Sequence, residues 1–371
     1  MVRTLLSHEW LAPHGGSENV FEQIAAALPA ADLQCLWNDA PERFQGVAET
    51  WLARSPLRGS KAAALPFMSS AWRSVDLDPY DRVISSSHAF GHQLAARAAE
   101  SGRQGFAYVH TPARYVWFPE FDQRGDSFAA RSAANALKRQ DRRRSSAAVR
   151  YAANSEFVRR RVQDAWGVDA QVIHPPVAVE RIQGISDWAD RVSGAEAELL
   201  TSLPDSFVLG ASRLIEYKRL DLAMEVGQAL GLPVVIAGDG PHAPELRSLA
   251  AAMSVPVTFT GRVSDEFLYA LYQRASLFVF MAIEDFGIMP VEAMAAGTPT
   301  LVNAVGGAAE SVAASGAGLA ADAESLDAIV EAAKLSIDLE RSAIAESAHR
   351  FSEATFRSAM LTWTSCIPEA E

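Results

Sequence analysis

Residues Phe278–Pro299 read FVFMAIEDFGIMPVEAMAAGTP, and this stretch decides how the chain is expected to fold. A short apolar strand comes first, a loop containing Gly287 follows, and Pro290 suits the first turn of a helix. Glu284 therefore falls in the loop and Glu292 in the first helical turn, both at the carboxyl end of the strand. Two carboxylates there suit a polyhydroxy ligand such as ribose or a sugar, because each accepts hydrogen bonds from hydroxyls. The alternative for Glu292 is compensation of the helix dipole.

The same alternation of short apolar strands and helix-length segments runs through nearly the whole chain. In the first half, strands are expected at Val2–Ser7, Asp32–Trp37, Arg82–Ser86, Gly105–His110, Val149–Asn154 and Gln171–His174. In the second half, they are expected at Phe207–Ala211, Pro233–Ala237, Val255–Thr260, Leu277–Met281, Pro299–Asn303 and Gly316–Ala320. This rhythm is typical of βαβ units, and it predicts an α/β fold with two buried parallel sheets.

The two series of strands are separated by Pro175 and Pro176, neither of which can donate a hydrogen bond to a sheet. The expected division is a first α/β domain at 1–175, a connector at 176–204, a second α/β domain at 205–350 and a final segment at 351–371. A helical pattern runs from Phe351 to Cys366 in that final segment. Ligands of open parallel sheets bind beyond the carboxyl ends of the strands, so a site is expected in a cleft between the domains.

The composition excludes several classes of protein. The 371 residues carry 33 Lys and Arg against 45 Asp and Glu, which gives a net charge of −12 and argues against a general nucleic-acid binder. Cys35 and Cys366 form no cluster with other metal ligands, so we expect no metal site and no disulfide framework. We see neither a signal peptide nor an apolar run long enough to span a membrane, and we expect a cytoplasmic protein.

A second motif follows the first strand of the second domain. Arg213 lies just past that strand, and Lys218 is expected to open the following helix. A forked guanidinium and a compact ammonium at the edge of a sheet suit a diphosphate. The alternative is ordinary solvated surface charge. The turn Gly238-Asp239-Gly240-Pro241 lacks the full dinucleotide-binding fingerprint, so a dehydrogenase is disfavoured.

Two features of the first domain lie at comparable positions. Gly16 and Ser17 follow the first strand, where Ser17 suits a helix N-cap and Gly16 would expose backbone N–H groups to a phosphate. His110 ends another strand and precedes Thr111 and Pro112. Each feature taken alone is more often structural than functional.

Taken together and in this order, the motifs resemble the retaining glycosyltransferases of family four, which have the GT-B architecture. The resemblance is carried by Gly15-Gly16-Ser17-Glu18, His110-Thr111-Pro112, Arg213 with Lys218, Gly238-Asp239-Gly240-Pro241, and Glu284 to Glu292. It covers most of the chain. It implies two Rossmann-like domains facing a central cleft and a final helix that returns to the first domain.

The resemblance also implies roles for individual residues. Arg213 and Lys218 would hold the donor diphosphate, with Gly16 contacting it from the other domain. Glu284 and the backbone of Phe286 and Gly287 would hold the donor sugar, with Ile288 beside them. His110 would contact the sugar on its far side. Glu292 would hold the ribose. The family is metal-independent, so we expect no metal and no cofactor, only a nucleotide-sugar substrate.

Within the family, the segment Tyr108–Trp117 resembles bacterial mannosyltransferases that build polysaccharide or glycolipid. The base of the nucleotide would pack near Val263, and Asp265 could accept hydrogen bonds from the N1–H and N2–H₂ of guanine, which uracil lacks. The other reading is that Asp265 caps the helix Glu266–Arg274. We expect a hexosyl, most readily mannosyl, transfer from GDP-mannose to a glycolipid, polyprenyl-linked or oligosaccharide acceptor. A UDP-sugar donor, a nucleotide-sugar epimerase and a non-catalytic binding partner remain alternatives.

A basic region runs from Arg131 to Arg161, with clusters at 142–144 and 159–161. Its plain interpretation is a solvated helix face. The functional interpretation is a surface for an anionic membrane or a diphosphate-bearing acceptor at the inner face of the membrane. Nucleic acid is disfavoured, because no aromatic residues interleave the arginines.

Overall fold

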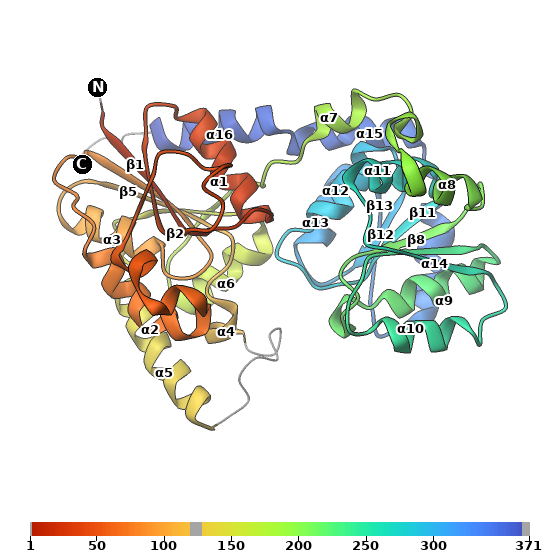
Figure 1. The fold of residues 1–371 in the computed structure, drawn as a ribbon, viewed down its shortest axis with the longest axis horizontal. Helices are drawn as coiled ribbons and strands as arrows, with labels where there is room; N and C mark the ends of the chain where they lie inside the picture. The colour runs from red at the N-terminus through yellow and green to blue at the C-terminus, as the bar shows by residue number, and fades with distance from the viewer. Residues whose placement is uncertain (1, 119–127, 366–371) are drawn as a thin grey trace. The chain divides into compact units, whose positions relative to one another are not determined.

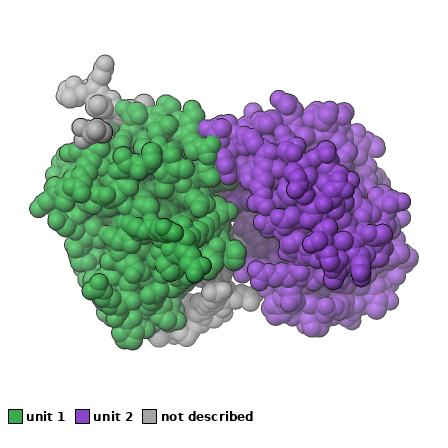
Figure 2. Space-filling model, turned by 45° about the horizontal axis from the view of Figure 1, so that its top comes forward, with its two compact units in different colours: residues 1–176, 356–371 green, residues 177–355 purple. Residues whose placement is uncertain are grey.

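The computed structural model of the chain describes residues 2–118 and 128–365, and it contains two compact units (Figures 1 and 2). Unit 1 comprises Met1–Pro176 together with Phe356–Glu371, and unit 2 comprises Val177–Thr355. Each unit is built on one parallel β-sheet. None of the helices in the described ranges is both long and apolar enough to cross a membrane.

The sheet of unit 1 has seven strands in the order β3-β2-β1-β4-β5-β6-β7, and all of its neighbouring strands pair in parallel. The strands are β1 (Thr4–Leu11), β2 (Asp32–Asn38), β3 (Val47–Glu49), β4 (Arg82–Ser87), β5 (Gln104–Val109), β6 (Arg150–Ala153) and β7 (Gln171–Val172). All six expected strands are present, and β3 is additional. This three-residue strand at the sheet edge is largely exposed, so it has no apolar run that a sequence pattern could reveal.

Helices pack on both faces of this sheet (Figure 1). The α-helices of the first part of the chain are α1 (Gly16–Ala27), α2 (Lys61–Arg73), α3 (His92–Glu100), α4 (Arg114–Trp117), α5 (Phe128–Arg143) and α6 (Glu156–Trp166). The last helix, α16 (Glu353–Ser365), joins α1 over the same face. There Phe356, Met360 and Trp363 share a buried cluster with Phe21 and Ile24.

Unit 2 has a six-stranded parallel sheet in the order β10-β9-β8-β11-β12-β13. Its strands are β8 (Val208–Ala211), β9 (Val234–Ala237), β10 (Val257–Gly261), β11 (Leu277–Phe280), β12 (Thr300–Asn303) and β13 (Gly318–Ala321). Its α-helices are α7 (Val179–Gln183), α8 (Gly194–Ser202), α9 (Leu220–Leu230), α10 (Ala243–Ala250), α11 (Asp265–Arg274), α12 (Ile288–Ala295), α13 (Gly307–Ser315), α14 (Leu326–Ser336) and α15 (Arg341–Ser347). Two apolar clusters fill the spaces between the sheet and its helices.

The segment 176–204, expected to be a connector, is part of the core of unit 2. Ile182, Trp188 and Leu200 are almost completely buried in the larger of the two clusters. The Trp188 indole N–H donates to the carbonyl oxygen of Ile182 at 2.8 Å, and Arg274 donates to the carbonyl of Leu200 at 2.6 Å. Most charged residues of this segment are exposed, so its composition did not reveal its apolar face. The boundary at which the chain returns from unit 2 to unit 1 likewise differs from expectation. It lies at Phe356 rather than at residue 351.

We predict that α16 stabilises unit 1 through its buried face. Met360 is 0% exposed and Leu361 is 43% exposed, so the two adjacent residues form a matched pair. Met360→Ala should lower the free energy of unfolding by about 2–5 kcal/mol, and Leu361→Ala by less than about 0.5 kcal/mol. Urea titrations followed by circular dichroism measure both values. Equal losses in the two variants would contradict this packing.

Candidate active site

The order of the chain reverses in the middle of each sheet, between β1 and β4 in unit 1 and between β8 and β11 in unit 2. Connections on the two sides of such a point run in opposite directions, which leaves a crevice beyond the carboxyl ends of the two central strands. In unit 2, Arg213 and Lys218 follow β8, and Glu284 follows β11. The residues expected to bind the diphosphate and the sugar thus lie in the loops that follow two neighbouring strands, at the point where the chain order reverses.

Lys218 and Glu284 contact each other directly. The Lys218 ammonium donates to Glu284 Oε1, and their side chains are only 9% and 20% exposed. The Lys218 nitrogen also lies 5.5 Å from the centre of the ring of Phe280, which is the last residue of β11. Contrary to expectation, Lys218 does not open α9. It ends a short 3₁₀ helix, Glu216–Lys218, and Arg219 in a left-handed conformation (φ 50°) separates it from α9.

Arg213 is exposed, and its backbone is held by the turn after β9. Leu214 N–H donates to the carbonyl of Asp239 at 3.0 Å. A Cβ atom on Gly238 would lie 1.8 Å from the carbonyl oxygen of Ser212, so only glycine fits there. The motif Gly238-Asp239-Gly240 therefore has a structural task in this chain. It allows the segment after β8, which carries Arg213, to pack closely against the turn after β9.

The loop between β11 and α12 is held by the start of α13. Phe286 is buried. Gly287 has a φ of 89° and is the N-cap of α12, whose first helical residue is Ile288. Gly307 N–H donates to the carbonyl of Glu284 at 2.8 Å, and a Cβ on Gly307 would lie 2.1 Å from the carbonyl oxygen of Asp285. The pair Gly306-Gly307 was missed in the sequence. Its position just beyond a predicted strand, after Ala304 and Val305, was the available signal.

Glu292 is the fifth residue of α12, one position beyond the first turn where it was expected, and that turn holds no acidic residue. The interpretation of Glu292 as a first-turn dipole partner is therefore wrong. Burial and, to a smaller extent, the charge of Asp265 raise the pKa of Glu292 to about 7, against the opposing effect of Arg181. The coupling between the two acids indicates that Glu292 and Asp265, expected near ribose and base, belong to one polar region of unit 2.

Asp265 does not cap its helix. Ser264 is the N-cap of α11, because its hydroxyl oxygen accepts from the Phe267 N–H at 3.2 Å, and α11 begins at Asp265 itself. The capping alternative for Asp265 is thus wrong, and its carboxylate is exposed in the first turn. Val263, just before the cap, is half-buried.

The N-terminus of α1 in unit 1 also differs from expectation. Gly15 is the N-cap, whereas Ser17 is the second helical residue and donates to Glu18 at 2.8 Å. The buried Glu18 carboxylate accepts from Ala12 N–H at 3.3 Å and so occupies part of this helix end. Gly16, the first helical residue, is exposed.

His110 follows β5 and is almost entirely buried. Its Nε2 lies 2.8 Å from the Ser86 hydroxyl, and its carbonyl accepts from the Asn154 amide at 3.0 Å. Burial and, to a smaller extent, the nearby His88 lower the pKa of His110 to about 3. The ring is therefore a neutral hydrogen-bonding group at neutral pH. Two further histidines, His8 and His88, lie around it, and the sequence analysis did not single them out.

The basic region does not form one charged face. Arg131 has a side chain outside the described residues, and the remainder is divided among α5, β6 and α6. Arg142 donates to the carbonyls of Asp164 and Ala165, and Arg159 pairs with Asp169 at 2.8 Å. Arg161 is 7% exposed, with its guanidinium 4.2 Å from the centre of the Phe157 ring. Several of the basic side chains on α5 and α6 are therefore used in hydrogen bonds, ion pairs and ring contacts within the protein.

Solved structures of glycosyltransferases have the same fold. The Anabaena protein HepE, in a complex with UDP and glucose, superposes with a TM-score of 0.67 at 17% identity, covering 99% of this chain and 100% of that one. WaaG, a glycosyltransferase involved in lipopolysaccharide biosynthesis, superposes with a TM-score of 0.66 at 18% identity, covering 98% and 100%. The expected GT-B fold with two Rossmann-like units is confirmed.

Two family models account for most of the chain. Residues 14–181 match Glycosyltransferase Family 4, and residues 196–357 match Glycosyl transferases group 1. The chain therefore belongs to these glycosyltransferases, and the family resemblance seen in the sequence is confirmed.

Proteins with similar sequences include a mannosyltransferase and a rhamnosyltransferase. The GDP-mannose-dependent alpha-(1-6)-phosphatidylinositol monomannoside mannosyltransferase of Mycobacterium tuberculosis is 32% identical over 212 residues, which are 53% of this chain and 54% of that protein. D-rhamnosyltransferase WbpZ of Pseudomonas aeruginosa is 38% identical over 94 residues, 24% of this chain and 25% of that protein. The alignment with the mycobacterial relative thus spans about half of its length.

We predict a pH-dependent stability that originates at Glu292. Its folded-state pKa of about 7 exceeds the ordinary value of 4.5, so the folded state binds this proton more tightly than the unfolded state. The contribution to stability is therefore fully present below pH 4.5 and is lost as the pH rises through about 7. Urea titrations of the unmutated protein and of Glu292→Gln should differ by roughly 1–3 kcal/mol more at pH 8 than at pH 5, in favour of the variant. Parallel pH profiles would contradict this assignment.

Proposed function

We propose that this chain is a retaining, metal-independent hexosyltransferase that moves mannose from GDP-mannose to a hydroxyl of a glycolipid, polyprenyl-linked or polysaccharide-precursor acceptor. The observation that carries the proposal is the contact between Lys218 and Glu284 at the reversal point of the unit 2 sheet. A cation suited to a diphosphate and a carboxylate suited to sugar hydroxyls are then adjacent, as a nucleotide sugar requires.

The bond between Lys218 and Glu284 also suggests how the donor is received. The diphosphate would take the ammonium as its partner, and the sugar hydroxyls would take the carboxylate. Both side chains are mostly buried, so removing one partner without replacement leaves a charge poorly solvated. A nucleotide sugar supplies both replacements in one molecule, whereas a nucleotide alone supplies only one. This difference favours productive binding of the intact donor.

In the proposed reaction, the bond from the anomeric carbon to the diphosphate oxygen breaks and a bond to the acceptor oxygen forms on the same face. The departing phosphate oxygen takes the acceptor proton. Arg213 and Lys218 would stabilise the negative charge that develops on the leaving diphosphate, which is electrostatic preorganisation. No divalent cation is needed for this step, because the two side chains supply the positive charge.

The proposed donor base is guanine, read by Asp265 with the backbone of Val263. The exposed carboxylate of Asp265 is not used for helix capping and is free to accept the N1–H and N2–H₂ of guanine. The name of the mycobacterial relative, which is GDP-mannose-dependent, supports the same choice. That relative acts on a phosphatidylinositol mannoside, which supports a lipid-linked acceptor here. Exposed Arg139 and Arg143 of α5 are the residues we would assign to an anionic membrane surface.

We predict that Arg213→Ala and Lys218→Ala each lose activity. Removing a charge-assisted contact to the leaving group should cost about 2–4 kcal/mol of transition-state stabilisation, or roughly 30- to 1,000-fold in kcat/KM. Release of GDP from GDP-mannose, with a phosphatidylinositol mannoside as acceptor and with water alone, measures the effect. Lys334→Ala is the control, because Lys334 is an exposed residue of the same unit that pairs with its helix neighbour Glu331. Activity of both variants within about threefold of the control would refute the assignment.

We predict that Asp265→Ala weakens GDP binding by about ten- to a hundredfold and hardly changes UDP binding. In the variant the N1–H and N2–H₂ of guanine lose their carboxylate acceptor, which costs roughly 1–3 kcal/mol. Ser264→Ala is the matched control. It should lower the free energy of unfolding by about 1 kcal/mol through loss of the N-cap and leave base preference unchanged. Calorimetric titrations with both nucleotides separate the outcomes, and tighter binding of UDP than GDP by the unmutated protein would refute the guanine assignment.

A further inference from the structure

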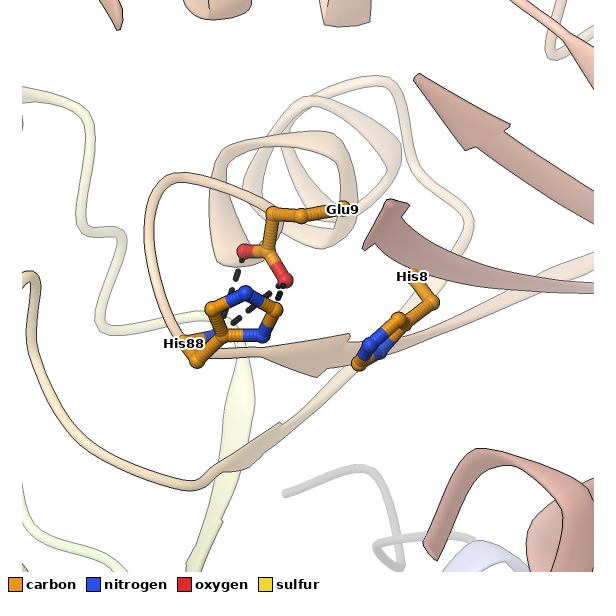
Figure 3. Close-up of side chains that lie close together, drawn as sticks. All are labelled: His8, Glu9 and His88. Atoms are coloured by element: carbon orange, nitrogen blue, oxygen red, sulfur yellow. Dashed lines mark hydrogen bonds and ion pairs between the residues drawn. The ribbon is translucent and has the colours of Figure 1, made fainter. Parts of the chain in front are cut away.

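A second group of polar side chains lies in unit 1, where the chain order reverses between β1 and β4. His8 and Glu9 belong to β1, and His88 directly follows β4 (Figure 3). One ligand atom from each of the three side chains can be chosen so that all three lie within 4.8 Å of one another. His8 and Glu9 are fully buried, and the His88 side chain is 17% exposed.

The hydrogen bonding of His8 determines which of its nitrogens is available. Nδ1 lies 3.1 Å from both the carbonyl oxygen and the hydroxyl of Ser86. The carbonyl can only accept, and the hydroxyl can donate its hydrogen to Nε2 of His110 at 2.8 Å, so Nδ1 of His8 carries the hydrogen. Nε2 of His8 then keeps its lone pair, and among the described residues it has no hydrogen-bond partner. A buried acceptor with no donor is costly. An imidazole that donates one N–H to a backbone carbonyl and leaves the other nitrogen free is the usual arrangement of a metal-bound histidine.

Glu9 is oriented just as firmly. Its Oε1 accepts from the Ser87 hydroxyl at 3.0 Å and from the N–H groups of Ala89 and Gly91 at 2.9 and 2.8 Å. Its Oε2 lies 3.1 Å from Nδ1 of His88. The first oxygen thus anchors the carboxylate, and the second faces the histidine. Carboxylates that ligate metals are held by outer hydrogen bonds in this way.

From these observations we propose that His8, Glu9 and His88 form a binding site for a divalent transition-metal ion, with Zn²⁺ the best match. Two imidazole nitrogens and one carboxylate oxygen are a common zinc ligand set, with a fourth position left for water. With bonds of about 2.0–2.2 Å, tetrahedral ligand atoms are roughly 3.3 Å apart. The His88–Glu9 pair already meets that spacing at 3.1 Å, and a ligand atom of each of the three residues lies within 4.8 Å of the others.

The charges around the cluster are compatible with this assignment. Burial lowers the pKa of His8, and it lowers the pKa of His88 to about 3, so both rings are neutral ligands at neutral pH. Lys61 is a positive charge near His88 and opposes a cation. Its ammonium lies 4.3 Å from the centre of the Trp10 ring, which partly satisfies it. The buried carboxylate of Glu9 supplies the opposing negative charge.

The test measures metal binding without nucleotide, so its result does not depend on the proposed transferase activity. Full-length, untagged protein is freed of metal with a chelator and titrated calorimetrically with ZnCl₂, and in parallel with CoCl₂ while the visible absorption of tetrahedral Co²⁺ is recorded. We expect one ion per chain. His88→Ala and Glu9→Gln should each bind at least about a hundredfold more weakly. His349→Ala, which removes an exposed histidine of unit 2, should bind like the unmutated protein.

His88→Ala keeps the test decisive if Glu9→Gln does not fold, because His88 is partly exposed and its backbone, not its ring, helps to orient Glu9. Circular dichroism establishes folding of every variant. Absence of stoichiometric binding in the unmutated protein would overturn the proposal and leave only a close approach of His88 Nδ1 to Glu9 Oε2 among the described residues. Equal binding by the unmutated protein and His88→Ala would also overturn it, since the ion would then lie elsewhere.

Discussion

Parallel strand pairing is the constraint on which both candidate sites depend. Every described neighbour pair in the two sheets is parallel, so all strand exits of a sheet gather at one edge. Where the chain order reverses, the loops on either side diverge and leave room for polar side chains between them. In unit 2 this brings together Lys218 and Glu284, and in unit 1 it brings together His8, Glu9 and His88. The two candidate sites lie at equivalent points of their sheets because the topology repeats.

The polar groups at both points are held by backbone that approaches very closely. Gly238 allows the exit of β9 to contact the segment carrying Arg213, and Gly307 allows α13 to contact the loop carrying Glu284. In unit 1, backbone N–H groups at the start of α3 hold the carboxylate of Glu9. Rigid backbone around charged groups limits their reorganisation when a ligand binds or reacts. Glycines in such loops therefore fix the position of the charged groups through close backbone packing.

The electrostatic settings of the two units differ. Unit 2 combines two cations, Arg213 and Lys218, with carboxyl groups at Glu284, Glu292 and Asp265. One of these, Glu292, has a pKa near 7 and is balanced between its charged and neutral forms. Unit 1 presents neutral imidazoles, with the pKa values of His88 and His110 lowered to about 3 by burial. Anionic and hydroxyl-bearing ligands suit the first setting, and neutral hydrogen-bonding groups or a metal cation suit the second.

Local sequence determined the strands, the class of fold and the loop containing Glu284, because alternation of apolar runs and the spacing from Glu284 to Glu292 can be recognised within about 20 residues. Tertiary structure alone decided what lies beside these segments. Ser264 rather than Asp265 caps α11. Segment 176–204 enters the core of unit 2, because its apolar residues pack against α11 and α12. The cluster around Glu9 joins residues about 80 positions apart through the register that places His8 opposite Ser86. No pattern in a single stretch can reveal such a pairing, since long-range register depends on the packing of the whole sheet.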